Sequence, residues 1–176
     1  MPRGSQEKPT TQGGQETPFD VYRQGGSTAP IRFTIALVLV ARRWRSLIDE
    51  RLRPMAQSSA RMEALSAIMN SSGPNAQIEI ANRLRIEGPT MTRMIDVLSR
   101  DGLVERRPAP GDRRIKHLEL TDAGFRALDE IFAVTDEMRA RLLEDFSAEE
   151  IDRITDVLNL MLEKLDRGLG DPERAG

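Results

Sequence analysis

The sequence predicts a mainly α-helical protein with one two-stranded β-hairpin near its middle. Apolar residues recur three and four positions apart along most of the chain, which is the period of helices with one buried face. Two of the expected helices, residues 77–84 and 89–101, are short and separated only by a tight turn, as in a helix-turn-helix. Two strand-like runs follow them directly and flank a loop rich in proline and arginine.

The N-terminal part is expected to begin as a disordered arm and to continue as a long helix. Residues 1–30 consist mainly of Gly, Pro, Ser, Thr and Gln, which cannot form a core. From Ile31 to Arg53, apolar residues line one side of a helix that Pro54 ends. The next helix is expected from Ser59 to Met69, before a Ser-Ser-Gly-Pro stretch that favours a turn.

The helix-turn-helix and the hairpin have recognisable boundaries. The first short helix is expected from Gln77 to Leu84, and the second starts at Pro89, where the missing N–H of proline costs nothing. Gly102 ends this second helix, because glycine tolerates the left-handed backbone found at helix ends. The strands are expected over residues 103–107 and 115–120, with residues 108–114 as the loop.

Two further helices are expected after the hairpin. Thr121 has the chemistry of a helix N-cap, and the helix that it starts should run to about residue 145. Ser147 and Glu150 fit a capping box at the start of the last helix. From Ile151 to Leu165 apolar residues stand at near-heptad spacing. Packing within a single chain can cover only one side of such a helix. With the apolar residues 35–39, these residues indicate a homodimer, although the last helix could also dock on its own lobe.

Composition excludes several classes of protein. The chain has no cysteine, which excludes thiol catalysis and disulfides, and its single His117 excludes a multi-histidine metal site within one chain. It also has no Gly-rich phosphate loop, so we expect no enzyme and no cofactor. No apolar run approaches the roughly 18 residues of a membrane span, and the start does not resemble a signal peptide. We therefore expect a cytoplasmic protein that does not bind membranes.

Charge is distributed unevenly, although the net charge is only −2. Residues 121–176 carry seven basic and fifteen acidic side chains, whereas the hairpin from Arg106 to Lys116 carries five basic and one acidic. A helix that fits the major groove, followed by a cationic hairpin, is typical of a double-stranded DNA-binding module. The acidic C-terminal part should then face away from phosphate.

The candidate DNA contacts lie on the second short helix and on the hairpin. Thr90, Thr92 and Arg93 occupy the first helical turns, where hydroxyls and the helix N-terminus can bind phosphate and an arginine can bind guanine. Each residue also has a simpler interpretation, as a helix cap or as a solvated arginine. The hairpin adds two groups: Asp112, Arg113 and Arg114 at the tip, for the minor groove, and Arg106, Arg107 and Lys116, for phosphates.

The order of these motifs resembles the MarR family of winged helix-turn-helix transcriptional regulators, and within it the SlyA-like branch. The resemblance covers roughly residues 31–166 and is most specific between Gly88 and Gly124. It is carried by four motifs: Gly88-Pro89-Thr90-Met91-Thr92-Arg93, Leu98-Ser99-Arg100-Asp101-Gly102-Leu103-Val104, Gly111-Asp112-Arg113-Arg114, and Leu120-Thr121-Asp122-Ala123-Gly124.

The resemblance implies a specific organisation and mode of action. It implies a homodimer that binds a pseudo-palindromic operator, here expected to be a repressor, with Pro89, Thr90 and Arg93 at positions that contact the major groove. One wing arginine would enter the minor groove while the other pairs with Asp112. The arm 1–30 would then be either a DNA-touching tail or inert. The domains would be residues 31–56 and 122–168 for dimerisation, 58–121 for the winged helix-turn-helix lobe, and 169–176 for a flexible tail.

The resemblance also implies a small effector, such as an aromatic or phenolic acid, bound between the dimerisation helices and the DNA-binding lobe. Arginine can hold a carboxylate through two hydrogen bonds, and methionine gives an adaptable apolar wall. The candidates are Arg42, Trp44, Arg45, Arg61, Met62 and Leu65. A simpler interpretation puts Trp44 and Met62 in the core and the arginines on the surface. The alternative to a DNA-binding regulator is a helical interaction module that does not bind DNA.

Overall fold

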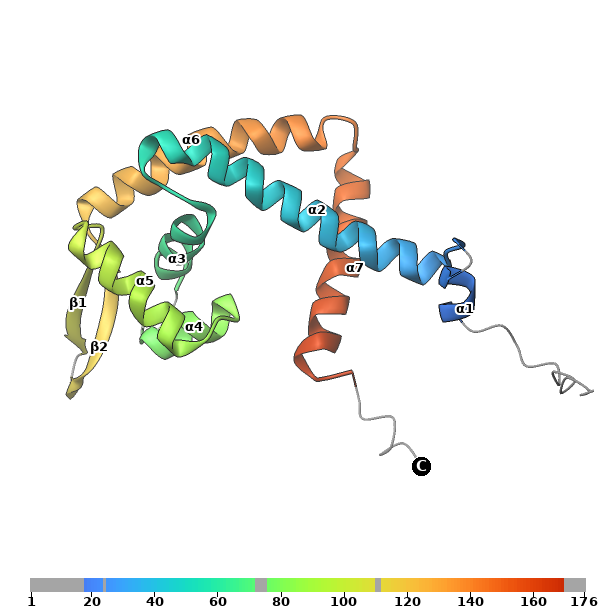
Figure 1. Cartoon of the computed structure of the whole chain (residues 1–176). Coiled ribbons are helices and arrows are strands. Elements are labelled where there is room, and N and C mark those ends of the chain that lie inside the picture. Colours follow the sequence, from blue (N-terminus) through green and yellow to red (C-terminus); the bar gives the residue numbers. More distant parts are fainter. Residues whose placement is uncertain (1–17, 24, 72–75, 110–111, 170–176) are drawn as a thin grey trace, which may run out of the picture. The chain divides into compact units, whose positions relative to one another are not determined.

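The computed structural model describes residues 18–23, 25–71, 76–109 and 112–169, with backbone only for Pro18, Asp20, Ala109 and residues 112–116. The chain divides into two compact units, residues 1–47 and 48–176. The elements are shown in Figure 1. In chain order they are α1 (Pro18–Arg23), α2 (Ala29–Leu52), a 3-10 turn (Arg53–Met55), α3 (Ser59–Met69), α4 (Gln77–Leu84), α5 (Gly88–Arg100), β1 (Val104–Ala109), β2 (Asp112–Leu120), α6 (Asp122–Leu143) and α7 (Ala148–Asp166).

The first unit holds α1 and most of α2. Helix α1 lies inside the segment that the sequence indicates as disordered, so that prediction is wrong for residues 18–23. A turn follows α1, in which the Gly26 N–H donates to the Val21 carbonyl at 2.9 Å. The helix forms because Phe, Val and Tyr interrupt the Gly- and Ser-rich composition there. The apolar residues of α2 in this unit are largely exposed, namely Phe33, Ile35, Val38, Leu39 and Val40.

The core of the second unit lies among the end of α2, helices α3 to α6 and the inner face of the hairpin. Asp49 joins α2 to α3 by accepting a hydrogen bond from the Ser59 N–H at 2.7 Å. The fully buried side chains are Leu52, Leu65, Ile68, Ile80, Met91, Ile95, Leu98, Leu118, Leu128, Ile131 and Thr135. Burial of each large aliphatic side chain contributes about 1.5–3 kcal/mol to the free energy of folding, relative to leaving it exposed. This core therefore holds α5 by one face.

The helix-turn-helix forms where the sequence places it. Helix α4 ends at Arg85, whose φ of +52° is left-handed, and the chain turns through Ile86 and Glu87 into α5. Pro89 lies in the first turn of α5, and Gly102, with φ of +71°, follows its end, as predicted. Of the apolar residues expected on one side of α5, Met91, Ile95 and Leu98 are buried and Met94 is half-buried. The opposite side of α5 is exposed.

The hairpin that forms the wing is longer than the sequence indicates. Its register pairs Val104 with Leu120 and Glu105 with Glu119, and it continues through Pro108 and Lys116. Residues 108, 109 and 112–114 are therefore strand rather than loop. Proline has no N–H to donate to the ladder, and it is tolerated here because the register becomes irregular directly after Pro108. A further bridge joins Ala76, at the start of α4, to His117.

The last two helices begin at the predicted caps. The Thr121 hydroxyl accepts the Gly124 N–H at 3.0 Å, and Ser147 with Glu150 forms the predicted capping box at the start of α7. Helix α6 ends at Leu143 rather than about residue 145. No residue of α7 is buried in one chain. Its exposed large apolar residues are Ile154, Val157, Leu158, Leu160, Leu162 and Leu165.

Candidate nucleic-acid interface

The outer side of α5 presents polar groups to solvent. Pro89, Thr90, Thr92 and Arg93 are all exposed, because they alternate with the residues that anchor the helix in the core. Within the part of the chain that the structure describes, Arg93 has no hydrogen bond or ion pair. Its guanidinium therefore keeps all its donors for a partner. Such a group can bind the O6 and N7 atoms of guanine with two hydrogen bonds.

Thr92 has a different environment from Arg93. Its hydroxyl donates to the Gly88 carbonyl at 3.0 Å and accepts from the Nε2 amide of Gln77 at 2.6 Å. Gln77 is the first residue of α4, so this contact joins the exposed start of α4 to the start of α5. Thr92 thus fixes the angle between the two helices. Sequence reasoning missed Gln77, since no spacing rule connects residues on two helices separated by a turn.

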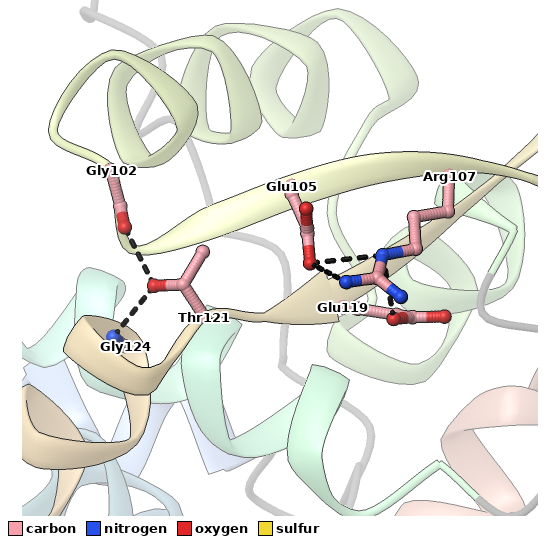
Figure 2. A network of polar contacts seen from close by, with 6 residues as sticks. All are labelled: Gly102, Glu105, Arg107, Glu119, Thr121 and Gly124. Carbon is pink, nitrogen blue, oxygen red and sulfur yellow. Dashed lines mark hydrogen bonds and ion pairs between the residues drawn. The ribbon is translucent and has the colours of Figure 1, made fainter.

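The arginines at the base of the wing are held by carboxylates. Arg106 pairs with Asp96 of α5, with 2.6 Å between Nη2 and Oδ1. This ion pair ties the wing to α5, which is the candidate recognition helix. Arg107 pairs with Glu105 and with Glu119 on the opposite strand, as Figure 2 shows. These two residues were expected to contact phosphate, and both carry intramolecular ion pairs. Their acidic partners were not predicted as functional residues.

A shared hydroxyl joins α5, the wing and α6. Thr121 donates to the carbonyl of Gly102 at 2.6 Å and accepts the N–H of Gly124, as seen in Figure 2. Gly124 packs so tightly that an added Cβ would lie 2.1 Å from the carbonyl oxygen of Leu103. The Thr121 N–H donates to that same oxygen at 3.1 Å. These contacts therefore tie the turn that follows α5 to the start of α6.

The tip of the wing lies partly outside the described residues. The backbones of Asp112, Arg113, Arg114 and Lys116 belong to β2, but their side chains are not among those described, and neither are residues 110 and 111. The division of roles expected for the two tip arginines therefore stays a prediction. The cationic charge there is a property of the sequence.

The candidate effector residues fall into two groups. Arg42, Trp44 and Arg45 lie on α2 in the first unit, and the other three lie on α3 in the second. Leu65 is fully buried and belongs to the core, whereas Trp44 and Met62 are half-buried. Arg61 donates to Gln57 at 2.9 Å and pairs with Asp101 at 2.6 Å.

An open groove lies beside α5 and the start of α3. It has a volume of about 380 Å³ and is lined by one arginine from each helix. Its lining residues are Ser58, Arg61, Thr90, Arg93, Met94 and Val97. No cluster of three or more potential metal ligands occurs among the described residues, and no helix there is long and apolar enough to cross a bilayer.

Comparison with known proteins identifies the family. The MarR family profile matches residues 58–116. The transcriptional regulator PA3341 is 31% identical in sequence, over 77% of this chain and 98% of its own, with a TM-score of 0.69. The complex of S. aureus MepR with DNA is 22% identical over 78% of this chain and 99% of its own, with a TM-score of 0.70.

A MarR variant from E. coli in complex with operator DNA has a TM-score of 0.67 and is 24% identical, over 75% of this chain and 94% of its own. At these identities the two DNA complexes show a shared fold only, that of a winged helix. The profile match and the similarity to PA3341 go further: this chain belongs to the MarR family of transcriptional regulators.

Proposed function

We propose that this protein is a sequence-specific DNA-binding regulator that acts as a homodimeric repressor on a pseudo-palindromic operator. The exposed side of α5 carries this proposal, because the Arg93 guanidinium has no partner among the described residues and core packing fixes the helix from behind. The basic wing adjoins it, and two proteins of the same fold have been solved with DNA. We also propose that the protein belongs to the SlyA-like branch of the family, on the basis of the motifs between residues 88 and 124.

Dimerisation is proposed through α2 and α7, the first long helix and the last helix. Six large apolar side chains of α7 are exposed in one chain, and so are five of α2. Exposed apolar surface of this extent is costly in water and is typical of a helix that packs against a partner. Two copies of the DNA-binding lobe would then present two recognition helices to a two-fold symmetric site. We propose the domain boundaries on the same grounds, with residues 31–56 and 122–168 as the dimerisation region.

The test of DNA binding is selection from random fragments followed by affinity measurement. Purified protein should enrich a sequence with inverted repeats and bind it more tightly than arbitrary DNA, with affinity that falls as salt rises. A protein that enriches no sequence and shows no salt-dependent binding would contradict the proposal. It would favour instead a helical interaction module built on the exposed side of α7.

A small anionic effector is proposed as the regulating ligand, and no catalytic role is assigned to the chain. Arg42, Trp44 and Arg45 of α2 and Arg61 and Met62 of α3 stay the candidate contacts. An aromatic carboxylate that binds a DNA-incompetent arrangement better than the competent one must weaken operator binding. Isothermal titration with salicylate-like and phenolic acids, followed by operator affinity at saturation, tests this. Absence of both heat and any change in operator affinity would contradict it.

A further inference from the structure

Two glutamates face each other on a hairpin whose tip is cationic. Glu105 of β1 and Glu119 of β2 are direct partners in the strand register. Like charges at directly opposite positions destabilise a hairpin, and carboxylates repel the phosphates of DNA. Both side chains are about half-exposed, at 41% and 47%, so neither is needed for the core. Their position therefore calls for a reason other than packing.

The guanidinium of Arg107 lies between these two carboxylates. Its Nε and Nη2 atoms lie 2.9 Å and 2.5 Å from Oε1 of Glu105, and Nε lies 3.2 Å from Oε2 of Glu119 across the strands (Figure 2). Val104, Leu118 and Leu120 alternate with these residues and are buried, so the three charges share the outer face of the wing. The two carboxylates also raise the pKa of Arg107 above its ordinary value.

The cluster turns a cationic position into a net negative one. The positive charge of Arg107 balances the negative charge of one carboxylate, and the charge of the second carboxylate remains unbalanced within the cluster. A phosphate that approached Arg107 would have to displace Glu105 and also lie close to Glu119. Arg93, by contrast, has no carboxylate partner among the described residues, so a DNA group that approached it would not have to displace one. The wing base is therefore arranged to withhold a cation from the DNA backbone.

We propose that Glu105 and Glu119 are specificity-determining residues, which hold Arg107 away from phosphate and so keep the affinity for DNA of arbitrary sequence low. Binding to arbitrary sequence depends almost entirely on phosphate contacts, so one arginine withheld from the backbone lowers it directly. On the operator, base contacts fix the position of the protein, and the same arginine matters less. This inference rests on the DNA binding proposed above.

The test is the double variant Glu105→Gln and Glu119→Gln, which removes both charges and keeps the side-chain shapes. Fluorescence anisotropy with a random-sequence duplex, repeated over a series of salt concentrations, measures the result. The released arginine should add about 0.9 to the magnitude of the slope of log affinity against log salt concentration. It should also raise the affinity for random DNA roughly eightfold at about 0.1 M salt. Affinity for the selected operator should rise less, so that the ratio of operator to random affinity falls. The single variant Glu119→Gln leaves Glu105 in place. It should increase the salt slope and the affinity for random DNA by smaller amounts.

Two controls separate release of Arg107 from a general loss of negative charge. The same double substitution in an Arg107→Ala background should give little of the gain. Asp136→Asn with Glu137→Gln removes two carboxylates that pair with Arg139 and Arg141 within α6, more than a dozen residues along the chain from the wing. This matched variant should leave affinity for random DNA nearly unchanged.

Three outcomes would overturn the inference. The gain could persist in the Arg107→Ala background, it could appear equally in the helix control, or it could be absent altogether in variants whose melting shows that they are folded. Absence of DNA binding by the unaltered protein is a different result, because it would contradict the proposed function itself.

Discussion

Arg93 differs from Arg106 and Arg107 because its guanidinium has no partner among the described side chains. Arg93→Ala should cost roughly 1–3 kcal/mol of operator affinity and relax the preference at one base pair of each half-site. Arg100→Ala is the matched control, since Arg100 is exposed at the other end of the same helix. Anisotropy titrations on operator and random duplexes measure both. Equal losses on the two duplexes would show that Arg93 contacts only the backbone.

Among the glycines that the structure describes, Gly124 leaves the least room for a side chain. Gly124→Ala places a methyl group against the Leu103 carbonyl, which belongs to backbone and cannot rotate away. We expect a loss of about 1–3 kcal/mol in the free energy of unfolding, as for other overpacked sites. Gly88→Ala is the control, because an added Cβ there meets nothing within 4 Å. Thermal melting compares the two, and equal melting temperatures would contradict the role given to Gly124.

At the scale of elements, α7 is the helix whose apolar side most needs a partner. Leu158→Glu combined with Leu162→Glu places two charges on that side, so the protein should become monomeric or insoluble, because charges are rarely tolerated in apolar interfaces. Asn159→Glu, on the polar side of the same helix, should leave a dimer. Light scattering after size exclusion gives the mass of each. A folded dimer of unchanged stability from the double variant would place the interface elsewhere.

An exposed ion pair joins the end of α7 to the turn of the helix-turn-helix. Asp166 accepts from Nε and Nη2 of Arg85 at 2.8 and 2.5 Å, and these hydrogen bonds lower the pKa of the Asp166 carboxyl. A lowered folded-state pKa gives stability that is present above the unfolded value, about 3.9, and is lost as the pH falls through the folded value.

Asp166→Asn should therefore lower the melting temperature slightly at neutral pH, with a difference from the unaltered protein that shrinks below about pH 4. The effect is small because both side chains are half-exposed and screened by solvent. Glu163→Gln, which removes a carboxylate one turn earlier on α7, is a suitable control. A difference that grew as the pH fell would have the wrong sign for this ion pair.

At the scale of the whole molecule, a two-fold dimer requires two half-sites on one face of the DNA. Their centres should lie about 10 base pairs apart, which is one helical turn. Inserting about 5 base pairs between them should abolish tight binding, because it rotates one half-site to the opposite face of the duplex. Inserting a single base pair in the flanking DNA serves as the control. Tolerance of the 5-base-pair insertion would mean that the two lobes are not rigidly related.

Most element boundaries could be predicted, because they depend on local chemistry. Pro89, Gly102 and Thr121 act within a few residues of their own positions, and each has the predicted role. The ion pairs of Arg106 and Arg107 could not be predicted, since they depend on the strand register and on the angle between α5 and the wing. Helix α1 was missed because a few apolar residues are hidden in a stretch of polar composition.

The hydroxyl of Thr121, which binds both the end of α5 and the start of α6, has a mechanical consequence. Helix α6 has 22 residues and is therefore about 33 Å long. A rotation of about 5° about Thr121 that carried α5 and α6 together would move the far end of α6 by roughly 3 Å and the far end of α5, a helix about 20 Å long, by less than about 2 Å. The two helices are thus the short and long arms of one lever. A movement at the distant end of α6 therefore reaches the far end of α5 at roughly 0.6 of its size.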